Sequence, residues 1–166
     1  GGSRPGGGHS FSKWWAKYGA THPGYFTLHM FGKREPVLAP KPSYTDAFVK
    51  ICPSNPDVAD RIVTDWLPGK DRVKFVGAGV SDGSANFCEC DNCKALDVPL
   101  GKERFADHLT DRYVYLANSV ARKVREHRPD AYVAMYAYMN TLRPPRKLKV
   151  EPNVVVQVVP YVIPLE

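Results

Sequence analysis

The sequence predicts an α/β fold with a parallel sheet, present as a partial (β/α) barrel of TIM type. Segments with strand composition alternate with segments of helical periodicity, which is the pattern of parallel strands joined by crossover helices. The strand segments are almost continuously apolar, as expected for strands buried on both faces. An open doubly wound sheet shares this local pattern, but no G-x-G-x-x-G or P-loop marks the chain as a nucleotide-binding fold.

The length places a limit on this barrel. The chain has 166 residues, and a complete eight-stranded barrel takes roughly 200 or more. We therefore expect a single domain over residues 1–166 that forms part of a barrel. The chain begins with a glycine-rich stretch and without methionine, so we also expect it to belong to a larger chain.

The first predicted strand covers residues 47–52, and a helix follows it. Asn55 is a good helix cap, and Pro56 fits the first helical turn. Asp57 meets the positive end of the helix dipole. The helix is expected to end at Pro68, because proline cannot continue it.

Three more strands are expected at residues 73–81, 131–139 and 153–161, running parallel to the first. The longest helix of the sequence, from Phe105 to His127, precedes the third strand and should pack outside the sheet. Its apolar side chains recur at helical spacing. They are Phe105, Leu109, Tyr113, Leu116, Val120 and Val124.

The composition indicates a globular domain with a basic surface. Hydrophobic residues make up 43% of the chain and the formal net charge is +6, which suits either a polyanionic partner or an ordinary solvated surface. We favour the solvated surface and do not expect nucleic acid to be the main partner. The sequence has no run of about 18 apolar residues, so we expect no membrane span.

Four cysteines form the strongest local signal. Cys88, Cys90 and Cys93 lie in one short loop, and Cys52 ends a predicted strand at the sheet edge where that loop begins. Zinc takes four thiolates tetrahedrally, so we expect a structural zinc ion with no open position for a catalytic water. A disulfide that includes Cys52, or four free thiols, would explain the same residues.

A carboxylate, Asp82, follows the predicted strand at residues 73–81. Barrel enzymes place their chemistry at the C-terminal ends of their strands, and glycoside hydrolysis uses a pair of carboxylates. Asp82 is therefore the candidate catalytic residue. The Asp82-Gly83 pair also suits a plain Asx-turn without any catalytic role.

Aromatic and polar side chains near other predicted strand ends are the candidate substrate-binding residues. They are His9, Trp14, Tyr136, Tyr138, Asn140 and Tyr161. Aromatic faces can stack on sugar rings, and imidazole or amide groups can bond sugar hydroxyls, but such aromatic residues can also simply fill a core. All but Trp14 and Asn140 are expected to gather with Asp82 around one cleft.

Several short motifs occur in a fixed order along the chain. They are Gly7-Gly8-His9-Ser10-Phe11, His22-Pro23-Gly24-Tyr25-Phe26, Cys52-Pro53-Ser54-Asn55-Pro56, Val80-Ser81-Asp82-Gly83, Asp111-Arg112-Tyr113 and Asn153-Val154-Val155-Val156. This series resembles a bacterial domain-of-unknown-function family found beside α-glucuronidase-like and hexosaminidase-like glycoside hydrolases. The resemblance covers most of the chain.

The resemblance implies a barrel fold and an extracytoplasmic setting in which polysaccharides are degraded. It also implies that Cys52 accompanies the cysteine-rich loop, and that Asp82 stands where related α-glucuronidases have an acidic residue after the corresponding strand. The expected function is that of a glycoside-hydrolase-like enzyme whose carbohydrate substrate is a polysaccharide or a uronic-acid or hexosamine glycoside. The alternative is a zinc-stabilised module that binds polysaccharide or nucleic acid without catalysis.

Overall fold

The computed structural model describes residues 10–30, 32–34, 49–81, 83, 85–99 and 109–159. Within these residues the helices and strands follow one another in the order α, α, β, α, α, β, β. Their bounds are α1 (Trp14–Tyr18), α2 (Pro56–Trp66), β1 (Phe75–Gly77), α3 (Asp91–Ala95), α4 (Thr110–His127), β2 (Tyr132–Ala137) and β3 (Val154–Val158).

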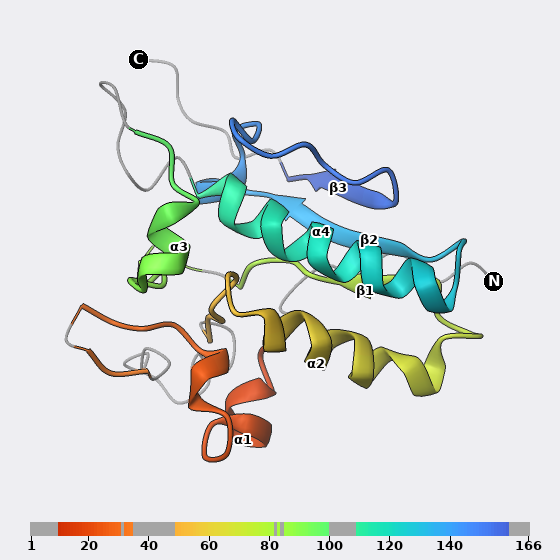
Figure 1. The fold of residues 1–166 in the computed structure, drawn as a ribbon, viewed down its shortest axis with the longest axis horizontal. Coiled ribbons are helices and arrows are strands. Elements are labelled where there is room, and N and C mark those ends of the chain that lie inside the picture. Colours follow the sequence, from red (N-terminus) through yellow and green to blue (C-terminus); the bar gives the residue numbers. More distant parts are fainter. Residues whose placement is uncertain are drawn as a thin grey trace.

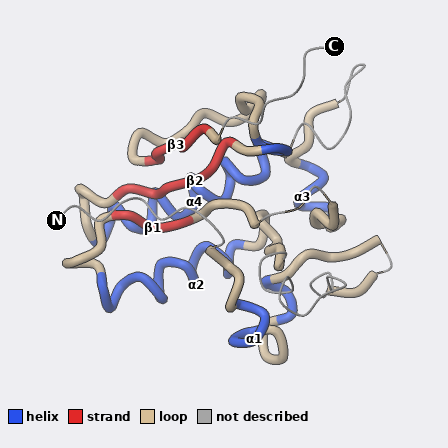
Figure 2. The backbone as a smooth tube through the Cα atoms, turned by 180° about the vertical axis from the view of Figure 1, so that it is seen from behind, coloured by secondary structure: helices blue, strands red, loops and turns tan. Residues whose placement is uncertain are grey.

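The three strands form one parallel sheet in the order β1-β2-β3. The register sets Phe75 beside Tyr132 and Val133 beside Val154. Helices α2 and α4 lie side by side on the same face of the sheet, in front of it in Figure 1 and behind it in Figure 2. The parallel pairing predicted for the last three strand segments is therefore confirmed.

Helix α2 forms where the local signals predict it. The side chain of Asn55 accepts a hydrogen bond from the backbone N–H of Asp57, and Pro56 is the first helical residue. The helix ends at Trp66 and passes into a short 3-10 turn, Leu67–Gly69. The cap satisfies one of the N–H groups that a helix start leaves without a partner.

Helix α4 buries the apolar stripe predicted for it, and residues 101–108 lie outside the described part of the chain. Leu109, Tyr113, Leu116, Val120 and Val124 are all at least 97% buried. They meet Val133 and Met135 of β2 in the main hydrophobic core. Burial of this stripe against the sheet holds the long helix in place.

The prediction of a partial TIM-type barrel is wrong. The described residues form an open sheet of three strands whose edges, β1 and β3, are not joined. The expected burial of the strands on both faces is also wrong for edge strand β3. There Val156 is 40% exposed and Val158 is 63% exposed. Alternating strands and helices determine local pairing, whereas closure depends on how many strands meet around an axis, which the local pattern does not contain.

The first strand is predicted at residues 47–52, and its described residues, 49–52, do not join the parallel sheet. Ile51 instead makes an isolated antiparallel bridge with Phe26. The described residues of this segment are apolar because they are core residues, with Val49 and Ile51 at 0% and 1% exposure. A short apolar run fits either a core segment or a strand, so its composition was misleading.

Among the described helices, none is long and apolar enough to cross a bilayer.

One buried carboxylate at the start of α4 organises the basic, proline-containing loop before β3. Asp111 is 3% exposed, and its two oxygens accept hydrogen bonds from the backbone N–H groups of Arg146, Lys147 and Leu148 at 2.8–2.9 Å. Charge-assisted bonds of this kind are stronger than neutral ones. Asp111 therefore fixes a loop that has no regular structure of its own.

Replacing Asp111 with asparagine is expected to lower the free energy of unfolding by about 1–3 kcal/mol. The amide keeps one oxygen, but its NH₂ group would face the N–H of Arg146, donor against donor. Chemical denaturation of the variant and the wild type measures the difference. Asp71→Asn, which changes an exposed carboxylate in a turn, should leave the stability almost unchanged. Equal stability of Asp111→Asn and wild type would contradict the anchoring role.

Candidate metal centre

The structure brings the four sulfur atoms of Cys52, Cys88, Cys90 and Cys93 together, all within 4.8 Å of one another. Cys88 Sγ lies 3.4 Å from Cys90 Sγ and 3.5 Å from Cys52 Sγ, and Cys52 Sγ lies 3.7 Å and 3.8 Å from Cys90 and Cys93. Four sulfurs bound to one tetrahedral ion at about 2.3 Å stand roughly 3.8 Å apart. This four-sulfur cluster could therefore hold a metal ion.

The ligands come from two separate segments that the fold joins. Cys52 precedes α2 and donates its backbone N–H to the carbonyl of Tyr25 at 2.8 Å. Cys88 and Cys90 lie in the loop before α3, and Cys93 lies within that short helix. All four cysteines are free, three of them are buried and Cys90 is half-buried. Free thiols at these distances fit a metal site and not a disulfide among them.

Neighbouring groups that the sequence did not single out also reach the four-sulfur cluster. Ser54 Oγ lies 3.0 Å from Cys93 Sγ, and the backbone N–H of Leu28 points to Cys88 Sγ at 3.3 Å. Hydrogen bonds from such outer groups orient metal ligands and stabilise their negative charge. Ser54 follows Cys52 by two residues, but no spacing rule marks it as a partner of sulfur.

A buried arginine ties α4 to the cysteine loop. Arg112 is 1% exposed. Its Nε and Nη2 donate to the carboxylate of Asp97 at 2.6 Å each, and its Nη1 donates to the carbonyl oxygen of Cys88 at 2.6 Å. The planar guanidinium fits a carboxylate with two parallel hydrogen bonds. Arg112 therefore fixes both the backbone of one ligand and the segment that follows α3.

Protons are shared unequally among the four sulfurs. Hydrogen bonds from Cys88 and Cys93 hold the pKa of Cys52 well below its usual range. The hydrogen bond to Cys52 raises the pKa of Cys88 to about 11 and raises the pKa of Cys93 as well. Burial raises the pKa of Cys90, but hydrogen bonds from the Cys93 backbone and Ser54 outweigh it and lower the net value. The hydrogen bonds among the sulfurs thus favour negative charge on Cys52.

Metal binding is expected to release protons and to weaken as the pH falls. A metal binds thiolates, and at neutral pH the raised pKa values keep Cys88 and Cys93 protonated in the metal-free chain. Both protons must leave, so the affinity rises with pH towards the pKa of Cys88 and is lost on acidification. Zinc titration in weakly buffered solution with a pH indicator measures the release. Binding without proton release would contradict this arrangement of protons.

Comparison with known proteins identifies the family of the chain. The model of a domain of unknown function (DUF4838) matches residues 3–165. The chain belongs to this family. No curated protein and no solved structure matches the chain. The role of the four-sulfur cluster in this DUF4838 domain is therefore argued from the geometry of the cluster itself.

The structure places the other candidate residues of the DUF4838 domain only in part. His9, Asp82 and Tyr161 lie outside the described residues. Tyr136 lies on β2, and Tyr138 and Asn140 follow at its C-terminal end. Asn140 is buried and its carbonyl accepts a hydrogen bond from the N–H of Leu109, so its backbone supports the start of α4.

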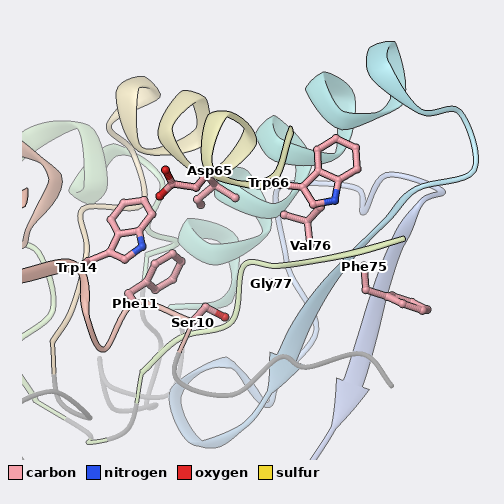
Figure 3. A pocket seen from close by; sticks show the side chains of 9 residues that line it. Ser10, Phe11, Trp14, Asp65, Trp66, Phe75, Val76 and Gly77 are labelled. Carbon is pink, nitrogen blue, oxygen red and sulfur yellow. The ribbon is translucent and has the colours of Figure 1, made fainter. Parts of the chain in front are cut away.

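Trp14 of the DUF4838 domain lies elsewhere, in α1, well away from the C-terminal end of β2 in both views (Figures 1 and 2). It is 8% exposed and packs edge-on against Phe11 and Tyr18. It also lines a hollow of about 310 Å³ between α2 and β1 (Figure 3). The residues around this hollow are Ser10, Phe11, Trp14, Ile62, Asp65, Trp66, Phe75, Val76 and Gly77.

Polar groups accompany the aromatic wall of this hollow. Ser10 Oγ is buried and has no hydrogen-bond partner among the described residues. The carboxylate of Asp65 accepts hydrogen bonds from the Tyr18 hydroxyl at 2.7 Å and from Lys17 at 3.3 Å, and pairs with Arg61 at 3.0 Å. An apolar hollow with a few polar groups is the usual form of a small-ligand site. Asp65 is already paired with Tyr18, Lys17 and Arg61, whereas the hydroxyl of Ser10, unpartnered within the described part of the chain, is free to bind a ligand.

Proposed function

We propose that the chain is a zinc-stabilised, carbohydrate-active domain. The observation that carries the zinc part is the geometry of the four-sulfur cluster, in which four Sγ–Sγ distances of 3.4–3.8 Å suit tetrahedral thiolate ligation. Four protein ligands leave no open position, so the ion has a structural role. It would join the segment at Cys52 to the loop that follows β1.

Elemental analysis and X-ray absorption test the zinc site directly. The purified domain should contain one zinc ion per chain, and the absorption spectrum should give four sulfur ligands at about 2.3 Å. A chain without bound metal, in which peptide mapping finds a disulfide between two of the four cysteines, would remove the zinc site. Iron in place of zinc would keep the ligands and change only the ion.

The carbohydrate part of the proposal is glycoside-hydrolase-like activity on a polysaccharide or on uronic-acid or hexosamine glycosides. It rests on the resemblance of the sequence motifs and on Asp82 as the acid, base or nucleophile that such chemistry needs. The zinc-bound loop belongs to the same connection between β1 and α4 as Asp82. The metal would stabilise this connection without taking part in the reaction.

Replacing Asp82 with asparagine in the full-length protein tests whether this residue is catalytic. Uronic-acid and hexosamine glycosides serve as substrates, and Asp71→Asn, which changes an exposed carboxylate, is the control. If Asp82 is catalytic, its amide variant should lose nearly all cleavage while folding and zinc content stay the same. Full activity of Asp82→Asn would exclude a catalytic role for this residue.

The second candidate function is a binding module without catalysis, and the hollow beside Trp14 favours it. Aromatic walls and the unpartnered hydroxyl of Ser10 could hold a sugar without any carboxylate pair. Binding of oligosaccharides without cleavage, weakened by Ser10→Ala, would favour the module. Because Ser10 Oγ has no partner among the described residues, the substitution should not lower the stability.

The cellular setting is part of the same proposal. An extracytoplasmic location rests on the resemblance of the sequence. Cell fractionation with antibodies against the domain tests the location. A cytosolic band would count against degradation of polysaccharide outside the cell.

A further inference from the structure

A tight turn beside the four-sulfur cluster brings a cation to it. The backbone N–H of His29 donates to the carbonyl of Lys33 at 2.8 Å, and Leu28 and Arg34 form an antiparallel bridge. Gly32 has a φ of 78°, which glycine adopts without strain and most residues do not. The turn reverses the chain, so Leu28 and Arg34 both come to lie next to the cysteines.

Arg34 is half-buried and lies at a hollow that two of the four cysteines also line. Its Nη1 donates to the carbonyl of Phe26 at 2.8 Å, which holds the side chain across the turn. Arg34 lines the same hollow as Cys52 and Cys90, and although burial lowers the pKa of its guanidinium, the neighbouring thiolates raise it above its usual value. The hollow measures about 340 Å³, and Arg34 is the one cation among the described residues that line it.

A tetrathiolate centre needs such a cation. Four thiolates around a divalent ion leave a net charge of −2, and three of the four sulfurs are buried. Burying an uncompensated charge is costly, and a nearby opposite charge lowers that cost. We infer that Arg34 is the counter-cation of the metal centre and determines how tightly the metal is held. This inference rests on the zinc site proposed above.

A simpler role for Arg34 would be to hold the turn closed through its bond to Phe26. The two roles differ in what they need from the side chain. Compensation of charge needs a cation near Cys52, whether guanidinium or ammonium, and acts only on the metal-bound centre. A purely structural role depends on the bond to Phe26, and its loss would weaken the fold with or without metal.

Zinc affinity of the purified domain, measured by competition with a chelator, separates the two roles. The variants are Arg34→Gln, which removes the charge, and Arg34→Lys, which keeps it. Arg72→Gln is the control, because it makes the same change of net charge on an exposed arginine in the turn between α2 and β1. Cobalt(II) replaces zinc in parallel samples, because its visible spectrum reports tetrahedral sulfur ligation.

We expect Arg34→Gln to bind zinc about 10- to 100-fold more weakly than wild type. Its cobalt spectrum should be unchanged, Arg34→Lys should lie closer to wild type than to Arg34→Gln, and Arg72→Gln should equal wild type. If Arg34→Gln does not fold, Arg34→Lys decides alone: affinity near wild type supports the inference, and a loss of tenfold or more overturns it.

The remaining outcomes are equally decisive. Equal affinity of Arg34→Gln and wild type would overturn the role of Arg34 while leaving the zinc site in place. Equal weakening in Arg34→Lys and Arg34→Gln would overturn charge compensation in favour of the bond to Phe26. A wild-type chain that binds no zinc would contradict the metal centre itself, and the counter-cation role would fall with it.

Discussion

Replacing Cys93 with serine is expected to abolish stoichiometric metal binding and to cause a large loss of stability. Cys93 is 0% exposed and lies within α3, where its sulfur meets Cys52 and Ser54. A hydroxyl is a poor substitute for a thiolate at a soft-ligand site. A ligand that binds only the folded chain stabilises it by about 4 kcal/mol when its concentration is 1,000 times the dissociation constant. The variant should lose stabilisation of this order.

Elemental analysis and denaturant unfolding with and without added zinc measure the effect. The control is Val120→Ala, which truncates a fully buried side chain on α4 away from the cysteines. Its expected cost is about 1–3 kcal/mol, with one zinc ion still bound and the same gain in stability from zinc. If Cys93→Ser retained one zinc ion and the full zinc-dependent stability, the four-sulfur cluster would not be the site.

The ligand set was predictable from the sequence because cysteine is rare and its chemistry is specific. Three cysteines within one short loop and a fourth at Cys52 suffice to suggest four sulfurs around one ion. Helix α2 was equally predictable, because the cap at Asn55 depends only on neighbouring residues. Signals of this kind act over a few residues, so they can be recognised in the sequence without any knowledge of the fold.

The groups around the ligands were not predictable in the same way. Arg34 and Arg112 reach the cysteine segments from distant parts of the chain, and each depends on where the fold places its backbone. The barrel failed for a related reason. Residues 47–52 and the three true strands share a strand-like composition, but only the tertiary arrangement decides that Ile51 pairs with Phe26 and stays outside the parallel sheet.

Arg112 provides the sharpest test of how the fold supports the metal centre. Arg112→Met keeps most of the volume but leaves the Asp97 carboxylate without its guanidinium and the Cys88 carbonyl without its donor. Removing one partner of a buried ion pair costs about 3–5 kcal/mol, and the cost here should lie near the lower end because the Asp97 side chain is 19% exposed. The free energy of unfolding should fall by this amount, and zinc affinity should fall too because the Cys88 backbone loses its anchor.

A double variant identifies the source of that loss. Asp97→Asn in the Arg112→Met background removes the unpaired charge, so the double variant should be more stable than Arg112→Met alone. Zinc affinity should not recover, because the Cys88 carbonyl still lacks a donor. Denaturant unfolding and chelator competition on wild type, Arg112→Met, Asp97→Asn and the double variant measure both quantities. A loss below about 1 kcal/mol in Arg112→Met is the size expected of an exposed ion pair, and would mean that Arg112 does not hold the cysteine loop.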